Sequence, residues 1–168
     1  MKKWMLALCL LVFSSQALAI QAGNQVNARV VWVHDGNTLT VTTGHVRTRD
    51  LKRWRVRLVD MDAPEKQQPF GKEAHDAMRD LVLTREIIIQ VHEVDATGRL
   101  IGRVFVQRSG EVIDVNHEMV RLGLAWVLDK GLRDQGLKDV QKTAQDERMG
   151  LWGASDSPMA PWEWRKRQ

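Results

Sequence analysis

The sequence has a single cysteine, Cys9, and no tyrosine. Cys9 lies inside an apolar run near the N-terminus, so a chain cut after that run carries no thiol. Such a chain can have no disulfide bond, no cysteine nucleophile and no zinc–thiolate site. The five histidines show no His-x3-His or comparable spacing, so the sequence gives no sign of a histidine metal centre.

Long apolar runs are also missing after the first residues. Lys2 and Lys3 precede the apolar run 4–13, and Ala17 and Ala19 fit the small-residue cleavage pattern of a secretory signal peptide. The run is too short for a membrane-spanning helix, and no later segment approaches the roughly 20 apolar residues that a span requires. We predict a signal peptide at residues 1–19 and a protein that is exported, to the periplasm or outside the cell, without a membrane partner.

Residues 20–168 contain no long linker rich in proline, glycine or serine, so we expect one domain with a hydrophobic core. The formal net charge of +4 falls to +2 when the two lysines of the signal peptide are removed. This mildly basic balance is compatible with a polyanionic partner but does not identify one. No feature implies a protein partner, and we expect a monomer.

Runs rich in valine, isoleucine, threonine and tryptophan predict five strands, at residues 26–33, 38–43, 53–59, 86–94 and 100–107. Helical spacing predicts three helices, at residues 69–83, 115–122 and 135–149. This order is typical of an α+β fold in which a five-stranded barrel of the oligonucleotide/oligosaccharide-binding type (OB-fold) carries three helices. Many such barrels only bind their ligands, so the function must be argued from site residues.

The segment from Arg57 to Glu65 contains an arginine, three carboxylates and a proline. A hard cation needs oxygen ligands, an attacking water needs a carboxylate, and a phosphate needs a guanidinium group. The segment therefore has the ingredients of a phosphodiester-cleaving site, although solvated charges on a barrel strand would give the same composition. Arg57 and Asp62 are five residues apart and face opposite sides of a regular strand, so they can act together only if the strand ends, bulges or coils between them. Pro64 favours a strand end.

Several motifs together carry a resemblance that none carries alone. They are Asp35-Gly36-Asn37-Thr38, Arg57-x4-Asp62-x-Pro64-Glu65, Pro69-Phe70-Gly71-Lys72-Glu73-Ala74, Asp95-x2-Gly98-Arg99, Gly123-Leu124-Ala125 and Gly150-Leu151-Trp152. In this order, and from about residue 28 to residue 164, the chain resembles the staphylococcal nuclease (thermonuclease) family. The resemblance implies a five-stranded barrel with three helices and a calcium-dependent phosphodiesterase that cuts DNA and RNA and leaves 3'-phosphates.

The resemblance also implies roles for individual residues. Asp62 and the backbone carbonyl of Ala63 look like ligands of one calcium ion. Glu65 looks like the residue that positions or deprotonates the attacking water. Arg57 and Arg99 look like the two phosphate-binding arginines.

Asn37 departs from the family pattern, because it stands where the family has its second metal-binding carboxylate. Its side chain still offers a carbonyl oxygen but removes one negative charge, so we predict weaker metal binding than in the usual family site. Asp60 could restore part of that charge or could simply be exposed, and Asp35 and Thr38 are further auxiliary candidates. Asn37 also leaves two alternatives open: a nucleic-acid-binding barrel that has lost catalysis, and an enzyme that uses another divalent metal.

Two other expectations concern aromatic and terminal residues. Trp32, Trp54, Trp126 and Trp152 are expected in the core, since tryptophans among apolar neighbours usually are. The tail at residues 161–167 ends in three consecutive basic residues and is expected to be a frayed, solvated terminus.

Overall fold

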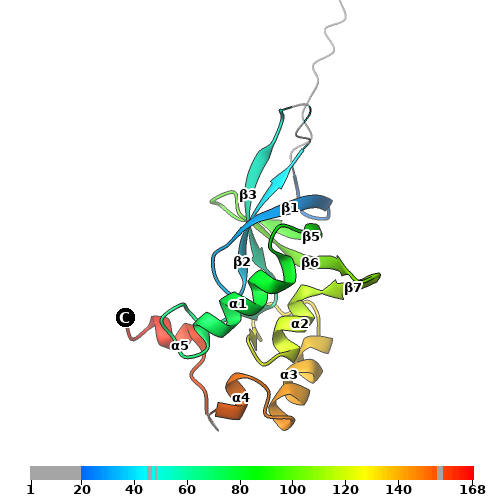
Figure 1. Cartoon of the computed structure of the whole chain (residues 1–168). Coiled ribbons are helices and arrows are strands. Elements are labelled where there is room, and N and C mark those ends of the chain that lie inside the picture. Colours follow the sequence, from blue (N-terminus) through cyan, green and yellow to red (C-terminus); the bar gives the residue numbers. More distant parts are fainter. Residues whose placement is uncertain (1–19, 45–46, 48, 155–156) are drawn as a thin grey trace, which may run out of the picture.

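The structure is a computed structural model that describes residues 20–44, 47, 49–154 and 157–168 (Figure 1). The predicted signal peptide at residues 1–19 lies outside the described residues. The longer strands are β1 (Gln25–Val33), β2 (Thr38–Thr43), β3 (Lys52–Leu58), β5 (Glu86–Val94) and β6 (Leu100–Arg108). The short strands are β4 (Met61–Asp62), β7 (Glu111–Asp114) and β8 (Trp126–Val127). The helices are α1 (Gly71–Val82), α2 (Val115–Arg121), α3 (Gly136–Asp146), α4 (Leu151–Ala154) and α5 (Pro161–Arg165).

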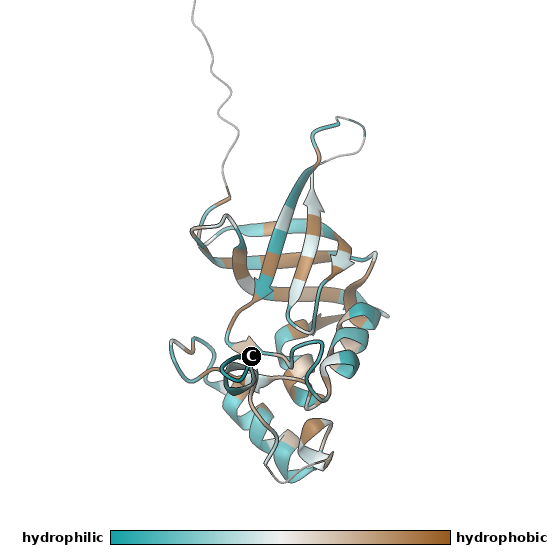
Figure 2. Cartoon of the chain, turned by 90° about the vertical axis from the view of Figure 1, so that its left-hand side faces the viewer, coloured by the Kyte–Doolittle hydropathy of each residue, from teal (hydrophilic) through white to brown (hydrophobic). Residues whose placement is uncertain are grey.

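The five longer strands form a closed barrel. They hydrogen-bond in the order β3-β2-β1-β5-β6, and a parallel pairing of β3 with β6 closes the ring. Apolar and polar residues alternate along the strands, as Figure 2 shows, so one face of each strand points inward. The barrel interior includes Val30, Leu39, Val56, Ile89 and Val104, all with 1% or less of their surface exposed.

The helices gather at one end of the barrel (Figure 1). Residues three or four positions apart on α1 face the core, among them Ala74 and Met78, which are both fully buried. The last helix, α5, lies beside the N-terminal end of α1, so the C-terminal segment returns to the start of α1. Among the described residues, no helix is long and apolar enough to cross a membrane.

The structure confirms the predicted fold class. All five predicted strands and all three predicted helices are present, with bounds that differ by a few residues. The prediction missed β4, β7, β8, α4 and α5, which are two to five residues long and too short to show a hydrophobic period. The expectation for Trp32 was wrong: it is 60% exposed on the outside of β1, whereas Trp126 is buried as expected.

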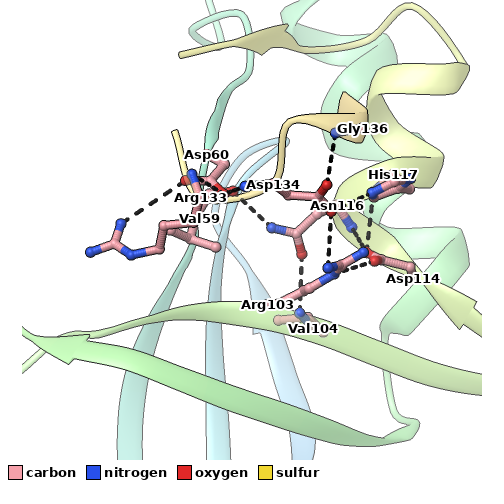
Figure 3. A network of polar contacts seen from close by, with 10 residues as sticks. All are labelled: Val59, Asp60, Arg103, Val104, Asp114, Asn116, His117, Arg133, Asp134 and Gly136. Carbon is pink, nitrogen blue, oxygen red and sulfur yellow. Dashed lines mark hydrogen bonds and ion pairs between the residues drawn. The ribbon is translucent and has the colours of Figure 1, made fainter. Parts of the chain in front are cut away.

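A buried asparagine fixes the corner between β3 and β4. The side-chain oxygen of Asn116, on α2, accepts a hydrogen bond from the backbone N–H of Val104, and its amide nitrogen donates to the carbonyl oxygen of Val59 (Figure 3). Asn116 is only 1% exposed, so these bonds satisfy polar groups that water cannot reach. The corner that carries the predicted site is therefore tied to the barrel and to α2.

Candidate active site

The chain turns sharply between Arg57 and Asp62. Strand β3 ends at Leu58, Asp60 has a left-handed φ of 64°, and β4 begins at Met61. Because the strand is broken here, the side chains of Arg57 and Asp62 come to the same side of the chain. Nη2 of Arg57 lies 2.7 Å from Oδ1 of Asp62. The predicted strand end between the two residues is confirmed.

The turn before β2 lies against the same corner. The backbone N–H of Leu58 donates to the carbonyl oxygen of Asn37, and β2 pairs with β3 so that Thr38 lies opposite Arg57. Gly36 lets the turn approach this closely, because a Cβ at this position would lie 2.6 Å from Cβ of Ala63. Nδ2 of Asn37 then donates to Oδ1 of Asp62 over 3.0 Å.

Two auxiliary candidates shape this turn. Oδ1 of Asp35 accepts the backbone N–H of Asn37 over 2.9 Å, which is the hydrogen bond of an Asx turn. The hydroxyl of Thr38 donates to Oδ1 of Asn37 over 3.3 Å. Both residues therefore hold Asn37 in place.

Asp62 is the most buried carboxylate of the site, with 3% of its side chain exposed. Oδ1 accepts hydrogen bonds from Arg57 and Asn37, and Oδ2 accepts one from Arg165 over 2.6 Å. A buried carboxylate requires such partners, because an unpaired charge in this position would be strongly unfavourable. Asp62 thus has two guanidinium groups and one amide as its hydrogen-bond partners.

The Glu65 side chain is 40% exposed, and its Oε1 lies 2.6 Å from Nη1 of Arg165. Its backbone is held more tightly. The side-chain oxygen of Gln68 accepts the backbone N–H of Glu65, and Gly71 packs so closely that a Cβ there would lie 1.9 Å from the Glu65 carbonyl oxygen. These contacts fix the backbone of Glu65, whereas its carboxylate remains accessible.

Arg99 is not brought into contact with these residues. Its Nε donates to Oδ2 of Asp95 over 2.9 Å within the hairpin between β5 and β6. Hydrogen bonds from the Thr97 hydroxyl, first of all, and from the backbone N–H of Arg99 lower the pKa of Asp95 to about 2. Strand register does place Arg99 near the site, because Arg57 pairs with Ile101, two residues further along.

Asp60 has a structural role that the sequence did not predict. Its Oδ2 accepts the backbone N–H groups of Arg133 and Asp134 at 3.1 and 3.0 Å, as Figure 3 shows. The alternative that Asp60 is simply exposed is wrong, because the residue is only 6% exposed. The carboxylate anchors the loop before α3, which leaves it no evident role in a metal cage.

The donors around Asp62 are hard oxygens, but few of them are charged. Among the residues that the structure describes, no group of three or more His, Cys, Asp and Glu side chains could hold a metal ion. The oxygens available are those of Asp62, the Asn37 side chain and the Ala63 carbonyl, which are the types that calcium prefers. The guanidinium of Arg165 already bridges Asp62 and Glu65, so both carboxylates can face one positive charge. The donor set therefore fits a divalent cation with a low count of ligand charge.

Sequence reasoning missed two residues of this site. The tail was expected to be frayed, yet Arg165 lies in α5 and contacts both carboxylates. Gln68 is 5% exposed and joins the Glu65 loop to the tail, since its Nε2 donates to the carbonyl oxygen of Met159 over 2.6 Å. Neither residue lies at a sequence distance from Asp62 that would indicate that it contacts the site.

Comparison with known proteins identifies the family of the chain. The family of staphylococcal nuclease homologues matches residues 55–154. An uncharacterized endonuclease of Escherichia coli O157:H7 is 35% identical over the whole of both chains. A micrococcal nuclease of Shigella flexneri is 31% identical, over 89% of this chain and 86% of its own. The chain belongs to the staphylococcal nuclease family.

Proposed function

We propose that this member of the family, a phosphodiester hydrolase, uses a divalent metal ion to cleave both DNA and RNA and leaves 3'-phosphates. Calcium is compatible with the donor set, since every available ligand is a hard oxygen. The observation that carries the proposal is the convergence of Arg57, Asp62 and Glu65 at the corner after β3. The family match and the names of the relatives support hydrolysis of nucleic acid.

In this proposal Glu65 acts on the water. It is the accessible carboxylate of the pair and lies on a loop that Gln68 and Gly71 hold rigidly. A carboxylate so placed can orient a water molecule and accept its proton as the water attacks phosphorus. The scheme needs no covalent intermediate, which agrees with the absence of cysteine from residues 20–168.

Arg57 supplies positive charge where the phosphate gains negative charge. Its guanidinium is fixed by Asp62, and 26% of the side chain remains exposed to a ligand. Arg99 is the second candidate, and it would have to exchange Asp95 for a phosphate oxygen. A metal ion held by Asp62, Asn37 and the Ala63 carbonyl would supply further electrostatic stabilisation of the transition state.

A second candidate function is binding of nucleic acid without cleavage. Asn37 favours it, because the residue that contacts Asp62 from the turn before β2 is a neutral amide and not a carboxylate. Glu65 argues against it, since a carboxylate directed at a phosphate repels it and serves no purpose in a binding module. We therefore prefer hydrolysis.

The test is a cleavage assay on the purified chain from residue 20 onward. Single- and double-stranded DNA and RNA are incubated with calcium, magnesium, manganese or a chelator, and the 3' ends of the products are analysed. Metal-dependent cleavage that leaves 3'-phosphates supports the proposal. Binding without cleavage under every condition would replace it with the binding module. Export through residues 1–19 is a separate proposal, tested by whether the protein accumulates in the periplasm or the medium with residue 20 at its N-terminus.

A further inference from the structure

Arg165 places a cation of the chain itself between the two carboxylates of the site. Nη2 lies 2.6 Å from Oδ2 of Asp62, and Nη1 lies 2.6 Å from Oε1 of Glu65. The two nitrogens of one guanidinium therefore bind two carboxylates that the proposed function assigns to the metal and to the water. Charge-assisted bonds of this length are the strong ones.

The segment that carries Arg165 is docked beside the site. Gln68 links the two through its side chain, which accepts from the N–H of Glu65 and donates to the carbonyl oxygen of Met159. Pro161, the first residue of α5, is buried. Trp164 lines a largely apolar cavity of about 260 Å³ together with Phe70 and Trp126. Arg165 thus reaches the carboxylates from an anchored helix and not from a free end.

The two partners of this contact differ in their access to water. Asp62 is 3% exposed and cannot exchange its partners for solvent, whereas Arg165 is 44% exposed. The guanidinium can therefore leave Asp62 at little cost, provided that another cation takes its place. Beside it lies a cavity of about 530 Å³, open to solvent, whose lining includes Asp35, Glu65 and Arg165 itself besides Arg55 and Lys66, and this cavity can receive the displaced side chain.

We propose that Arg165 is a built-in competitor of the metal ion and a determinant of metal affinity. In the metal-free protein it neutralises Asp62 and Glu65, and a cation that binds Oδ2 of Asp62 must first displace Nη2. This inference rests on the proposed function for the assignment of Asp62 to the metal. Displacement also removes the ionic contact that holds the end of α5, so metal binding loosens the C-terminal segment.

The size of the effect on metal affinity depends on the fraction of molecules in which Arg165 contacts Asp62, which we call the closed contact. A ligand that binds only the open state has its affinity reduced by the fraction of molecules that are open. If the contact is closed in about nine molecules of ten, its removal strengthens metal binding by about tenfold. The same competition acts on any divalent cation that uses this oxygen.

The experiment measures metal binding directly, without substrate. Calcium is titrated calorimetrically into the wild-type chain, Arg165→Gln and the matched control Arg167→Gln, whose side chain is exposed two residues further along. We expect Arg165→Gln to bind calcium about tenfold more tightly than wild type and Arg167→Gln to bind it like wild type. Equal or weaker binding by Arg165→Gln would overturn the inference.

Hydrogen exchange of the wild-type protein gives a second measurement that needs no variant. The backbone N–H groups of Glu163 and Trp164 donate to the carbonyl oxygen of Ala160, and we expect them to exchange faster when calcium is added. Unchanged or slower exchange would contradict displacement. Failure of the two proposals can be told apart. Tighter calcium binding by Arg165→Gln without any cleavage refutes only the nuclease mechanism, and metal-dependent cleavage with unchanged affinity refutes only the competition.

Discussion

The side-chain nitrogen of Asn37 donates to Oδ1 of Asp62 over 3.0 Å, although the two residues are 25 positions apart. This contact joins the turn before β2 to the corner after β3. It also places an uncharged group beside the most buried carboxylate of the site.

Asn37→Asp should strengthen metal binding and weaken the metal-free protein. A second carboxylate adds a charged ligand, and ligand charge is one determinant of calcium affinity. Without metal, the new carboxylate faces Asp62 and repels it, so we expect a lower unfolding temperature in chelator. Thermal unfolding with and without calcium measures both effects. A variant that binds calcium no better than wild type would show that Asn37 does not limit the site.

Gly71→Ala should displace the Glu65 loop. The new Cβ would lie 1.9 Å from the Glu65 carbonyl oxygen, so the backbone there has to move. A displacement of about 1 Å at a catalytic group can lower the rate about 10²-fold. The measurement is the cleavage rate at saturating metal, with Lys72→Ala on the exposed face of α1 as the control. A normal rate in Gly71→Ala would mean that the position of this loop does not matter.

The barrel and the cluster of charged residues between Arg57 and Glu65 could be predicted because both leave a pattern in the sequence. Alternating apolar residues mark β1, β2, β3, β5 and β6, and each strand has enough residues to show the period. A strand of two residues such as β4 shows no period. The charges of the segment also suggested its chemistry before any geometry was known.

The contacts of Asp60, Asn116 and Arg165 could not be predicted from the sequence, for physical reasons. Asp60 turns away because of a left-handed φ, which no residue type requires at that position. Asn116 is buried in a short helix, where its sequence neighbours do not distinguish it from an exposed asparagine. Arg165 belongs to a basic tail of ordinary composition, and only the docking of α5 reveals its partners.

Asn116→Ala should destabilise the fold. The substitution leaves the N–H of Val104 and the carbonyl of Val59 buried without a partner, and each unsatisfied group costs about 1–3 kcal/mol. We expect a loss of about 2–6 kcal/mol in the free energy of unfolding, measured by urea denaturation. Asn27→Ala, on an exposed position of β1, is the control. A loss below 1 kcal/mol would mean that water replaces the missing bonds.

Stability at low pH should depend on Asp134. A hydrogen bond from the His117 ring, assisted by Arg103, holds the pKa of Asp134 below its ordinary value of 3.8. A depressed carboxyl pKa adds stability that is present above pH 3.8 and is lost as the pH falls through the folded-state value. Asp134→Asn should therefore be less stable than wild type at pH 7, and the difference should shrink below about pH 4.

The control for this effect is Asp139→Asn, an exposed position on α3. Urea midpoints at pH 7, 4 and 3 provide the comparison. If the difference between wild type and Asp134→Asn is the same at all three values, the ionised carboxylate contributes nothing that depends on pH.

The central claim is that Glu65 acts on the water in a metal-dependent cleavage. The most direct test is the single-turnover cleavage rate of Glu65→Gln at saturating metal, beside wild type and the control Glu111→Gln on β7. Glutamine keeps the shape of the side chain and its bond from Arg165 but cannot accept a proton at neutral pH. We predict a rate about 10²–10⁴ times lower than wild type with an unchanged unfolding temperature. Cleavage by Glu65→Gln at the wild-type rate would contradict it.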